Sequence, residues 1–114
     1  MREKAMREVI LEQLGALRAD AGVEQVACKD ESVGDYLAGK ADALAVAMQM
    51  VESKAMIESM VHFLRHEENR NMNLAESARL AGKDTMARLR EGAAAGYMAA
   101  SRVVTEIREA NEHE

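Results

Sequence analysis

The ten residues Gly92-Ala-Ala-Ala-Gly96-Tyr-Met-Ala-Ala-Ser101 contain the pattern that decides the fold. Gly92 and Gly96 are four residues apart, so a helix places both on one face, where Ala93 and Ala100 add almost no bulk. A second helix backbone can approach such a face closely and gain dispersion contacts. A glycine inside a helix costs about 1 kcal/mol relative to alanine. We therefore expect close packing on this face to offset that loss.

Three alternatives explain what packs on this small-residue face. It can lie against another helix of the same chain, form a homo-oligomer interface, or support a ligand on exposed backbone. The charged residues that flank the stretch make the helix too polar for a membrane, where the same glycine spacing drives helix pairing. For the homo-oligomer, the predicted interface consists of Gly92, Ala93, Gly96, Ala100 and Val103.

The composition predicts an all-α fold in a single domain over residues 1–114. Hydrophobic residues make up 48% of the chain but only 3% of residues are aromatic, so helix formers outnumber strand formers. The sequence contains no proline, and therefore no residue that forces a break in a long helix. A chain of 114 residues has the length of one domain.

Hydrophobic periodicity predicts three helices, two of them long. They cover about residues 2–19, 32–67 and 73–110, where apolar residues recur at three- and four-residue steps. The polar run from 66 to 73 is predicted to be the turn between the two long helices. The pattern leaves open whether the last helix breaks at residues 82–84.

The segment between the first two predicted helices is expected to be a loop. Gly22 follows the last periodic residue of the first helix, where a left-handed cap is usual. Val23 and Val26 are expected to pack onto the core from this loop. Ser32 and Asp35 have the spacing of a capping box, which predicts that the second helix begins there.

The charge balance argues against two classes of partner. Fifteen basic and 20 acidic residues give a net charge of −5, whereas nucleic acid and anionic membranes favour positively charged proteins. No apolar run approaches the ~18 residues that span a bilayer, and the N-terminus lacks a signal-peptide core. We therefore expect a cytoplasmic protein, in which the single cysteine, Cys28, is an ordinary thiol.

Few residues have the spacing that catalysis or metal binding needs. His62 and His66 are four residues apart, but no third ligand stands near them in sequence. Without a Ser/His/Asp arrangement or a phosphate-binding glycine loop, we predict no enzyme activity, no metal and no cofactor. The stretch 74–82 is spaced like the start of a helix-turn-helix. Lys83 and Arg88 then occupy positions that are apolar in a helix-turn-helix, which argues against sequence-specific DNA recognition.

The segment Ala93–Val104, AAAGYMAASRVV, resembles the last helix of the phage anti-CBASS cyclic-nucleotide sponges. That helix carries a Gly-aromatic-Met-Ala run followed by a hydroxyl residue, Arg and Val. The family are small helical proteins that form compact homo-oligomers and sequester cyclic oligonucleotide signals without cleaving them, which blunts a bacterial immune response. The resemblance covers 12 of the 114 residues, and Ala100 stands where the family has a bulky residue. The matching positions are Gly96, Tyr97, Met98, Ala99, Ser101, Arg102 and Val104.

This resemblance implies a ligand-binding site on the final helix. Arg102 would be the phosphate-facing cation, because a guanidinium can hold phosphate oxygens bidentately. Tyr97 and Ser101 would lie beside it. The alternative for Arg102 is a surface residue that pairs with Glu106 one turn later.

Together, these features favour a small, phage-encoded, non-enzymatic protein that neutralises a host defence component in the host cytoplasm. It would act by binding or sequestration, with a cyclic nucleotide signal or a host protein as the target. The alternative is a structural, assembly or adaptor protein that acts through helix-mediated contacts. A DNA-binding regulator is a third interpretation.

Overall fold

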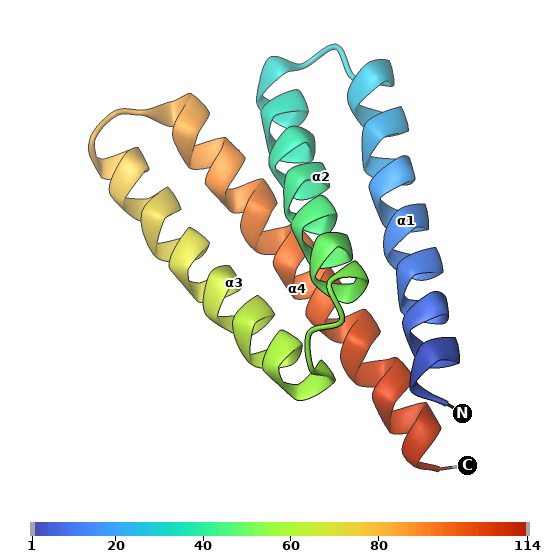
Figure 1. Cartoon of the computed structure of the whole chain (residues 1–114). Coiled ribbons are helices and arrows are strands. Elements are labelled where there is room, and N and C mark those ends of the chain that lie inside the picture. The colour runs from blue at the N-terminus through green and yellow to red at the C-terminus, as the bar shows by residue number, and fades with distance from the viewer. Residues whose placement is uncertain (1, 114) are drawn as a thin grey trace.

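The computed structural model describes residues 2–113, which form four helices (Figure 1). They are α1 (Glu3–Ala27), α2 (Glu31–Glu52), α3 (Ile57–Leu80) and α4 (Asp84–Glu112). The all-α class is confirmed, but the prediction of three helices was wrong, because a fourth arises from a break in the predicted second helix. Within residues 2–113, no helix is long and apolar enough to cross a membrane.

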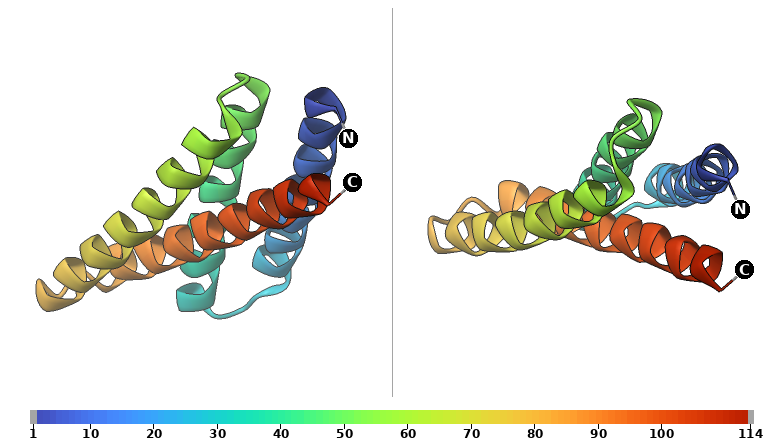
Figure 2. Two further views of the ribbon diagram at one scale, coloured as in Figure 1. Left: turned by 90° about the horizontal axis from the view of Figure 1, so that it is seen from below. Right: turned by 60° about the horizontal axis from the view of Figure 1, so that its bottom comes forward.

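The four helices form two hairpins that cross each other. Helices α1 and α2 run antiparallel, as do α3 and α4, and the N- and C-termini lie at the same end (Figure 1). Figure 2 shows the α3–α4 hairpin lying steeply across the α1–α2 hairpin. Helix α2 packs extensively on α4 and touches α3 only slightly, whereas α4 also contacts α1. Helix α4 is therefore the central element of the fold.

The core is one cluster of buried side chains to which every helix contributes. Its largest fully buried members are branched or long aliphatic residues, placed on the inward face of each amphipathic helix. They include Ile10 and Leu14 of α1, Leu44 and Val51 of α2, Met60 and Leu64 of α3, and Val104 of α4.

The predicted helix over 32–67 breaks between α2 and α3 at residues without a sequence signal. Lys54 adopts a left-handed conformation with φ of 64°. The Lys54 N–H donates to the Val51 carbonyl (3.2 Å) and the Ala55 N–H to the Met50 carbonyl (3.3 Å). This is the hydrogen-bond pattern of a Schellman motif, which usually has glycine at the left-handed position. A lysine there costs conformational free energy that other contacts must offset.

Arg7 of α1 supplies such a contact at the end of α2. Its guanidinium donates to the carbonyls of Val51 (3.3 Å) and Ala55 (2.6 Å), and it pairs with Glu3 at 2.7 Å. A cation at a helix C-terminus satisfies unpaired carbonyls and interacts favourably with the helix dipole. The break is thus stabilised by a residue more than 40 positions earlier in the chain.

The predicted turn at 66–73 is also wrong, because these residues lie inside α3. The turn follows instead at Gly82, which has a φ of 74°. The Gly82 N–H donates to the Arg79 carbonyl (3.0 Å) and the Lys83 N–H to the Ala78 carbonyl (2.8 Å). The predicted last helix over 73–110 is accordingly divided at this second Schellman motif, and α4 begins only at Asp84.

The first helix is longer than predicted, because α1 continues through Gly22 to Ala27. Val23 and Val26, which were expected on the core, are 70% and 90% exposed. They lie on the last turns of α1, beyond the part of the helix that carries its large buried side chains. The loop predicted between the first two helices is thus reduced to the segment 28–30.

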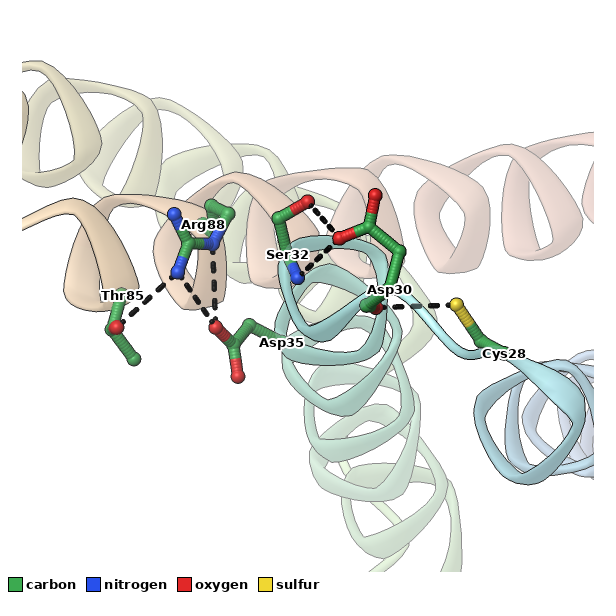
Figure 3. Close-up of polar contacts among 6 residues, drawn as sticks. All are labelled: Cys28, Asp30, Ser32, Asp35, Thr85 and Arg88. Carbon is green, nitrogen blue, oxygen red and sulfur yellow. Dashed lines mark hydrogen bonds and ion pairs between the residues drawn. The ribbon is translucent and has the colours of Figure 1, made fainter.

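The N-terminus of α2 is capped by Asp30 and not by Ser32. One Asp30 carboxylate oxygen accepts from the Ser32 backbone N–H (2.9 Å) and from the Ser32 hydroxyl (2.6 Å) (Figure 3). Asp35, the predicted capping-box partner, instead accepts from the Arg88 guanidinium at 3.1 Å. Arg88 also contacts the Thr85 hydroxyl, so this group ties the start of α2 to the start of α4 (Figure 3).

Candidate functional site

The small-residue face of α4 lies directly against α2. A Cβ atom at Gly96 would lie 2.6 Å from the Lys40 carbonyl oxygen and 2.8 Å from the Ala43 Cβ. A Cβ at Gly92 would overlap the Tyr36 carbonyl group. Real Cβ contacts essentially never fall below 3.0 Å. Backbone therefore touches backbone at this crossing, and the glycines permit the approach.

The α2 side of the crossing is equally bare. Gly39 faces the backbone of Leu89 and Ala93 so closely that a Cβ there would also overlap it. Gly39, Ala43 and Ala47 are all buried and repeat at four-residue steps. This Gly-x-x-x-Ala-x-x-x-Ala spacing is the signal that could have predicted α2 as the partner of the small-residue face.

The residues predicted at a homo-oligomer interface are wholly or partly buried inside one chain. Ala93 is partly buried and packs against the core. The remaining four, Gly92, Gly96, Ala100 and Val103, are buried within residues 2–113. Packing on a second helix of the same chain thus accounts for the small side chains. An oligomer stays a prediction, and its interface requires other surfaces than the buried part of this face.

A cavity of about 350 Å³ lies beside the crossing, between α2, α3 and α4. Its apolar wall is formed by aliphatic side chains of α2 and α4, and its polar wall combines charged groups with one amide and one phenol. The apolar lining residues are Ala43, Val46, Met86, Leu89 and Ala93, and the polar ones are Asp42, Glu67, Arg70, Asn71, Arg90 and Tyr97.

Asn71 organises the polar wall of this cavity. It is only 2% exposed, and its amide nitrogen donates to the Glu67 carbonyl at 2.8 Å. Its amide oxygen accepts from Arg90 at 3.2 Å, which holds that guanidinium of α4 against α3. The Glu67 carboxylate in turn pairs with Arg70 at 3.2 Å. A buried amide with both ends paired fixes the positions of its partners.

Tyr97 is the aromatic residue of the lining and is 8% exposed. Burial, followed by the negative charge of Glu67, raises the pKa of the Tyr97 hydroxyl. The positive charges of Arg70 and Arg90 oppose this rise, and Asp42 adds to it. The four charged groups of the cavity therefore all act on one phenol, which remains a protonated hydrogen-bond donor at neutral pH.

The structure brings only one of the three predicted ligand-binding residues to this cavity. Tyr97 lines it, but Ser101 is buried elsewhere on α4 and its hydroxyl donates to the Met98 carbonyl at 3.1 Å. Arg102 is exposed and is not part of the lining. The cations next to Tyr97 are instead Arg70 and Arg90, which sequence reasoning missed.

These two arginines were missed because each lies in a polar segment of the kind that is usually exposed to solvent. Arg70 falls in the polar run that was predicted to be a turn, and Arg90 in the charged segment before the glycines. Arg70 pairs with Glu67 within the same turn of α3, which is a common surface pattern, whereas Arg90 reaches Asn71 from another helix. A buried asparagine cannot be distinguished from a surface one by sequence periodicity when its neighbours are polar.

The histidine pair does not form a wider cluster. His62 and His66 are both exposed on α3. In the described part of the chain, no three His, Cys, Asp or Glu residues are placed to hold a metal ion together.

Residues 2–113 thus form four helices in two crossed hairpins, with a mixed polar and apolar cavity beside the crossing. No protein-family profile, curated protein or solved structure matches it.

Proposed function

We propose that this protein is a phage-encoded, non-catalytic binding protein that neutralises a host defence component by sequestering a small phosphate-bearing ligand. A cyclic nucleotide signal is the ligand class that we favour. The bound molecule would occupy the cavity between α2, α3 and α4. A volume of about 350 Å³ falls in the range of small-molecule pockets.

The observation that supports this proposal is the grouping of Tyr97 with Arg70 and Arg90 in one cavity. The Tyr97 ring packs in the core, so its hydroxyl, which keeps its proton at neutral pH, is the part of the residue that can donate to the ligand. A guanidinium offers parallel donors to phosphate oxygens. The resemblance of the segment Ala93–Val104 to the sponge helix includes Tyr97 and points to the same ligand class.

The placement of Arg102 changes the roles that the resemblance implies. Because Arg102 is exposed outside the cavity, the phosphate-facing role passes to Arg70, while Arg90 donates to the rest of the ligand. Arg90 is held by Asn71, so it is positioned in advance. Arg70 is half exposed and pairs with Glu67, so a phosphate would compete with that carboxylate for it.

A thermal-shift panel tests the proposal. We expect cyclic di- and trinucleotides to raise the melting temperature, and heat release followed by mass spectrometry to recover the ligand intact. Tyr97→Leu and Arg90→Met should each abolish most of the shift, whereas Arg102→Met should retain it. If no cyclic nucleotide shifts the unfolding transition, the proposal is wrong. Recovery of a hydrolysed product would overturn the non-catalytic part.

The alternative, an assembly or adaptor protein, is favoured by apolar side chains at one end of the molecule. Val26 is 90% and Leu80 is 84% exposed, at the C-terminal ends of α1 and α3. Both helices end on the side of the molecule opposite the chain termini (Figure 1). In Figure 1 the starts of α4 and α2 lie between these two helix ends, so the two side chains would offer separate contact points to a partner.

A homo-oligomer built through this end has its own test. Val26→Asp and Leu80→Asp should lower the mass measured by light scattering while far-ultraviolet helicity stays unchanged. Arg18→Asp, an exposed charge change in the middle of α1, is the control and should leave the mass as it is. A wild-type mass of one subunit would refute the oligomer.

A further inference from the structure

The charged groups of the α2–α3–α4 cavity balance one another. Asp42 and Glu67 bring two negative charges to the lining, and Arg70 and Arg90 bring two positive charges. A site for phosphate alone would carry excess positive charge, because each carboxylate repels the anion. The part of a ligand that enters this cavity therefore has to donate hydrogen bonds as well as accept them.

The two carboxylates differ in the partners they already have. Glu67 pairs with Arg70, and its second contact runs to the amide of Asn71. Asp42 of α2 is exposed at the edge of the cavity and forms no hydrogen bond or ion pair with any residue from 2 to 113. It is the carboxylate that a ligand can engage without displacing a protein group.

Arg90 offers the complementary donors. One of its terminal nitrogens donates to Asn71 at 3.2 Å, which fixes the plane of the guanidinium from one side. Its remaining N–H groups form no hydrogen bond within the described residues. Arg90 on α4 and Asp42 on α2 thus present free donors and free acceptors to the same cavity, next to the Tyr97 ring.

We propose that the cavity recognises a guanine base. The guanine N1–H and N2 amino group would donate to the two oxygens of Asp42, while O6 and N7 would accept from Arg90. Pairing of arginine with guanine O6 and N7 is the commonest specific contact to that base in nucleic-acid recognition. The Tyr97 hydroxyl lies beside these two groups as a further hydrogen-bond donor. This inference rests on the proposed function and narrows its ligand to guanine-containing nucleotides.

Other bases fit this arrangement less well. Adenine has its amino group next to N1, which carries a lone pair and no proton. One oxygen of the Asp42 carboxylate would accept from the amino group, and the other would be repelled by the N1 lone pair. Cytosine has the same arrangement at N4 and N3. Only guanine among the common bases offers two adjacent donors on one edge together with two acceptors on another.

Isothermal titration of the full chain with cyclic di-GMP and cyclic di-AMP tests this inference. We expect cyclic di-GMP to bind at least about fivefold more tightly, since one bidentate base contact discriminates by about 1–3 kcal/mol. Equal binding of the two, or tighter binding of cyclic di-AMP, would overturn the guanine assignment and leave the sequestration proposal standing. If neither cyclic dinucleotide nor any cyclic trinucleotide binds, both proposals fall.

Asp42→Asn provides a chemical test of the same contact. An amide presents one donor and one acceptor where the carboxylate presents two acceptors. We expect the variant to bind guanosine monophosphate at least about tenfold more weakly and xanthosine monophosphate more tightly than wild type does, because xanthine replaces the N2 amino group with a carbonyl oxygen. Asp20→Asn, an exposed carboxylate on α1, is the matched control and should leave both affinities unchanged. An unchanged guanine-to-xanthine preference in Asp42→Asn would overturn the proposal.

Discussion

A single methyl group at residue 96 tests whether the α2–α4 crossing holds the fold together. In Gly96→Ala the new Cβ would lie 2.6 Å from the Lys40 carbonyl oxygen and 2.8 Å from the Ala43 Cβ, whereas ordinary contact begins at 3.4 Å. The two helices must therefore separate by about 0.8 Å, which forfeits about a quarter to a half of the attraction in each dispersion contact.

The net effect is the difference between two opposing free energies. Overpacking of this kind costs about 2–3 kcal/mol, because the obstacle includes backbone that cannot rotate away. Replacing a helical glycine by alanine returns about 1 kcal/mol. We therefore expect Gly96→Ala to lower the free energy of unfolding by about 1–2 kcal/mol. Gly92→Ala should be more severe, since its Cβ would overlap the Tyr36 carbonyl.

A second glycine in a helix supplies the control. Gly22 lies within α1, and a Cβ there would meet nothing within 4 Å. Gly22→Ala should therefore raise the free energy of unfolding by about 0.5–1 kcal/mol through helix propensity alone. Urea unfolding followed by far-ultraviolet circular dichroism measures both variants. The reasoning is refuted if Gly96→Ala stabilises the protein as much as Gly22→Ala does.

Light scattering on the same variants shows whether a change in stability comes from packing inside one chain or from an interface between subunits. If the contact lies inside one chain, Gly96→Ala destabilises the protein without changing its subunit number in the folded state. Unchanged stability together with a lower mass would place the small-residue face at an interface between subunits.

Three further predictions concern the helix ends and the cavity phenol. Arg7→Met should lower the free energy of unfolding by about 2 kcal/mol, because it leaves the carbonyls of Val51 and Ala55 without their charged donor. Arg18→Met, on the exposed surface of α1, is the control. Equal losses of stability in the two variants would contradict the capping role of Arg7. Hydrogen bonds from the Ser32 side chain and backbone hold the pKa of Asp30 below its usual range. The ionised cap of α2 therefore stabilises the fold fully above the unfolded pKa of about 4, and this stabilisation is lost as pH falls through the folded pKa. Asp30→Asn should flatten this part of the acid unfolding profile, and an unaltered profile would argue against the cap. Burial raises the pKa of the Tyr97 hydroxyl above its ordinary value of 10.0. The protonated phenol therefore contributes its full stability below pH 10.0, and this contribution is lost as pH rises through the folded pKa. The difference between ultraviolet titrations of wild type and Tyr97→Phe should show a phenol that ionises above pH 10.0, and ionisation below pH 10.0 would contradict its burial.

The helical class followed from composition, but helix boundaries depended on contacts between distant residues. Gly82 marks the α3–α4 turn with the residue type that a left-handed cap favours. Lys54 has the same conformation and the same hydrogen-bond pattern without that signal. Its turn is stabilised by Arg7 from another helix, and no local pattern reports such a contact. A single long helix was therefore the natural prediction.

The polar run 66–73 was misassigned for a related reason. Helix α3 packs on α4 and scarcely on α2, so much of its surface faces solvent and carries polar side chains. Within this run Asn71 points inward and pairs with Arg90. Helix prediction from periodicity depends on apolar residues at regular steps. In this run the inward position is occupied by Asn71, so no apolar residue identifies the side of α3 that packs on α4.

The candidate site was predicted in part, through Tyr97. The residue was identified by resemblance together with Ser101 and Arg102, but Arg102 follows Tyr97 by five positions, which turns it to another side of the helix. Arg102 is therefore exposed while Tyr97 faces the cavity. The charged groups that surround Tyr97 come from three helices, and their grouping depends on the crossing of the two hairpins, which the sequence patterns did not specify.

Amide chemical-shift mapping with cyclic di-GMP tests the central claim, that the cavity between α2, α3 and α4 is the binding site. Saturable shifts should concentrate at residues 39–46, 67–71 and 86–97 and disappear in Tyr97→Leu, whose unperturbed spectrum elsewhere would show that it remains folded. Saturable shifts confined to the surface around Arg102, or the absence of any shift at ligand concentrations that saturate known cyclic-nucleotide receptors, would contradict it.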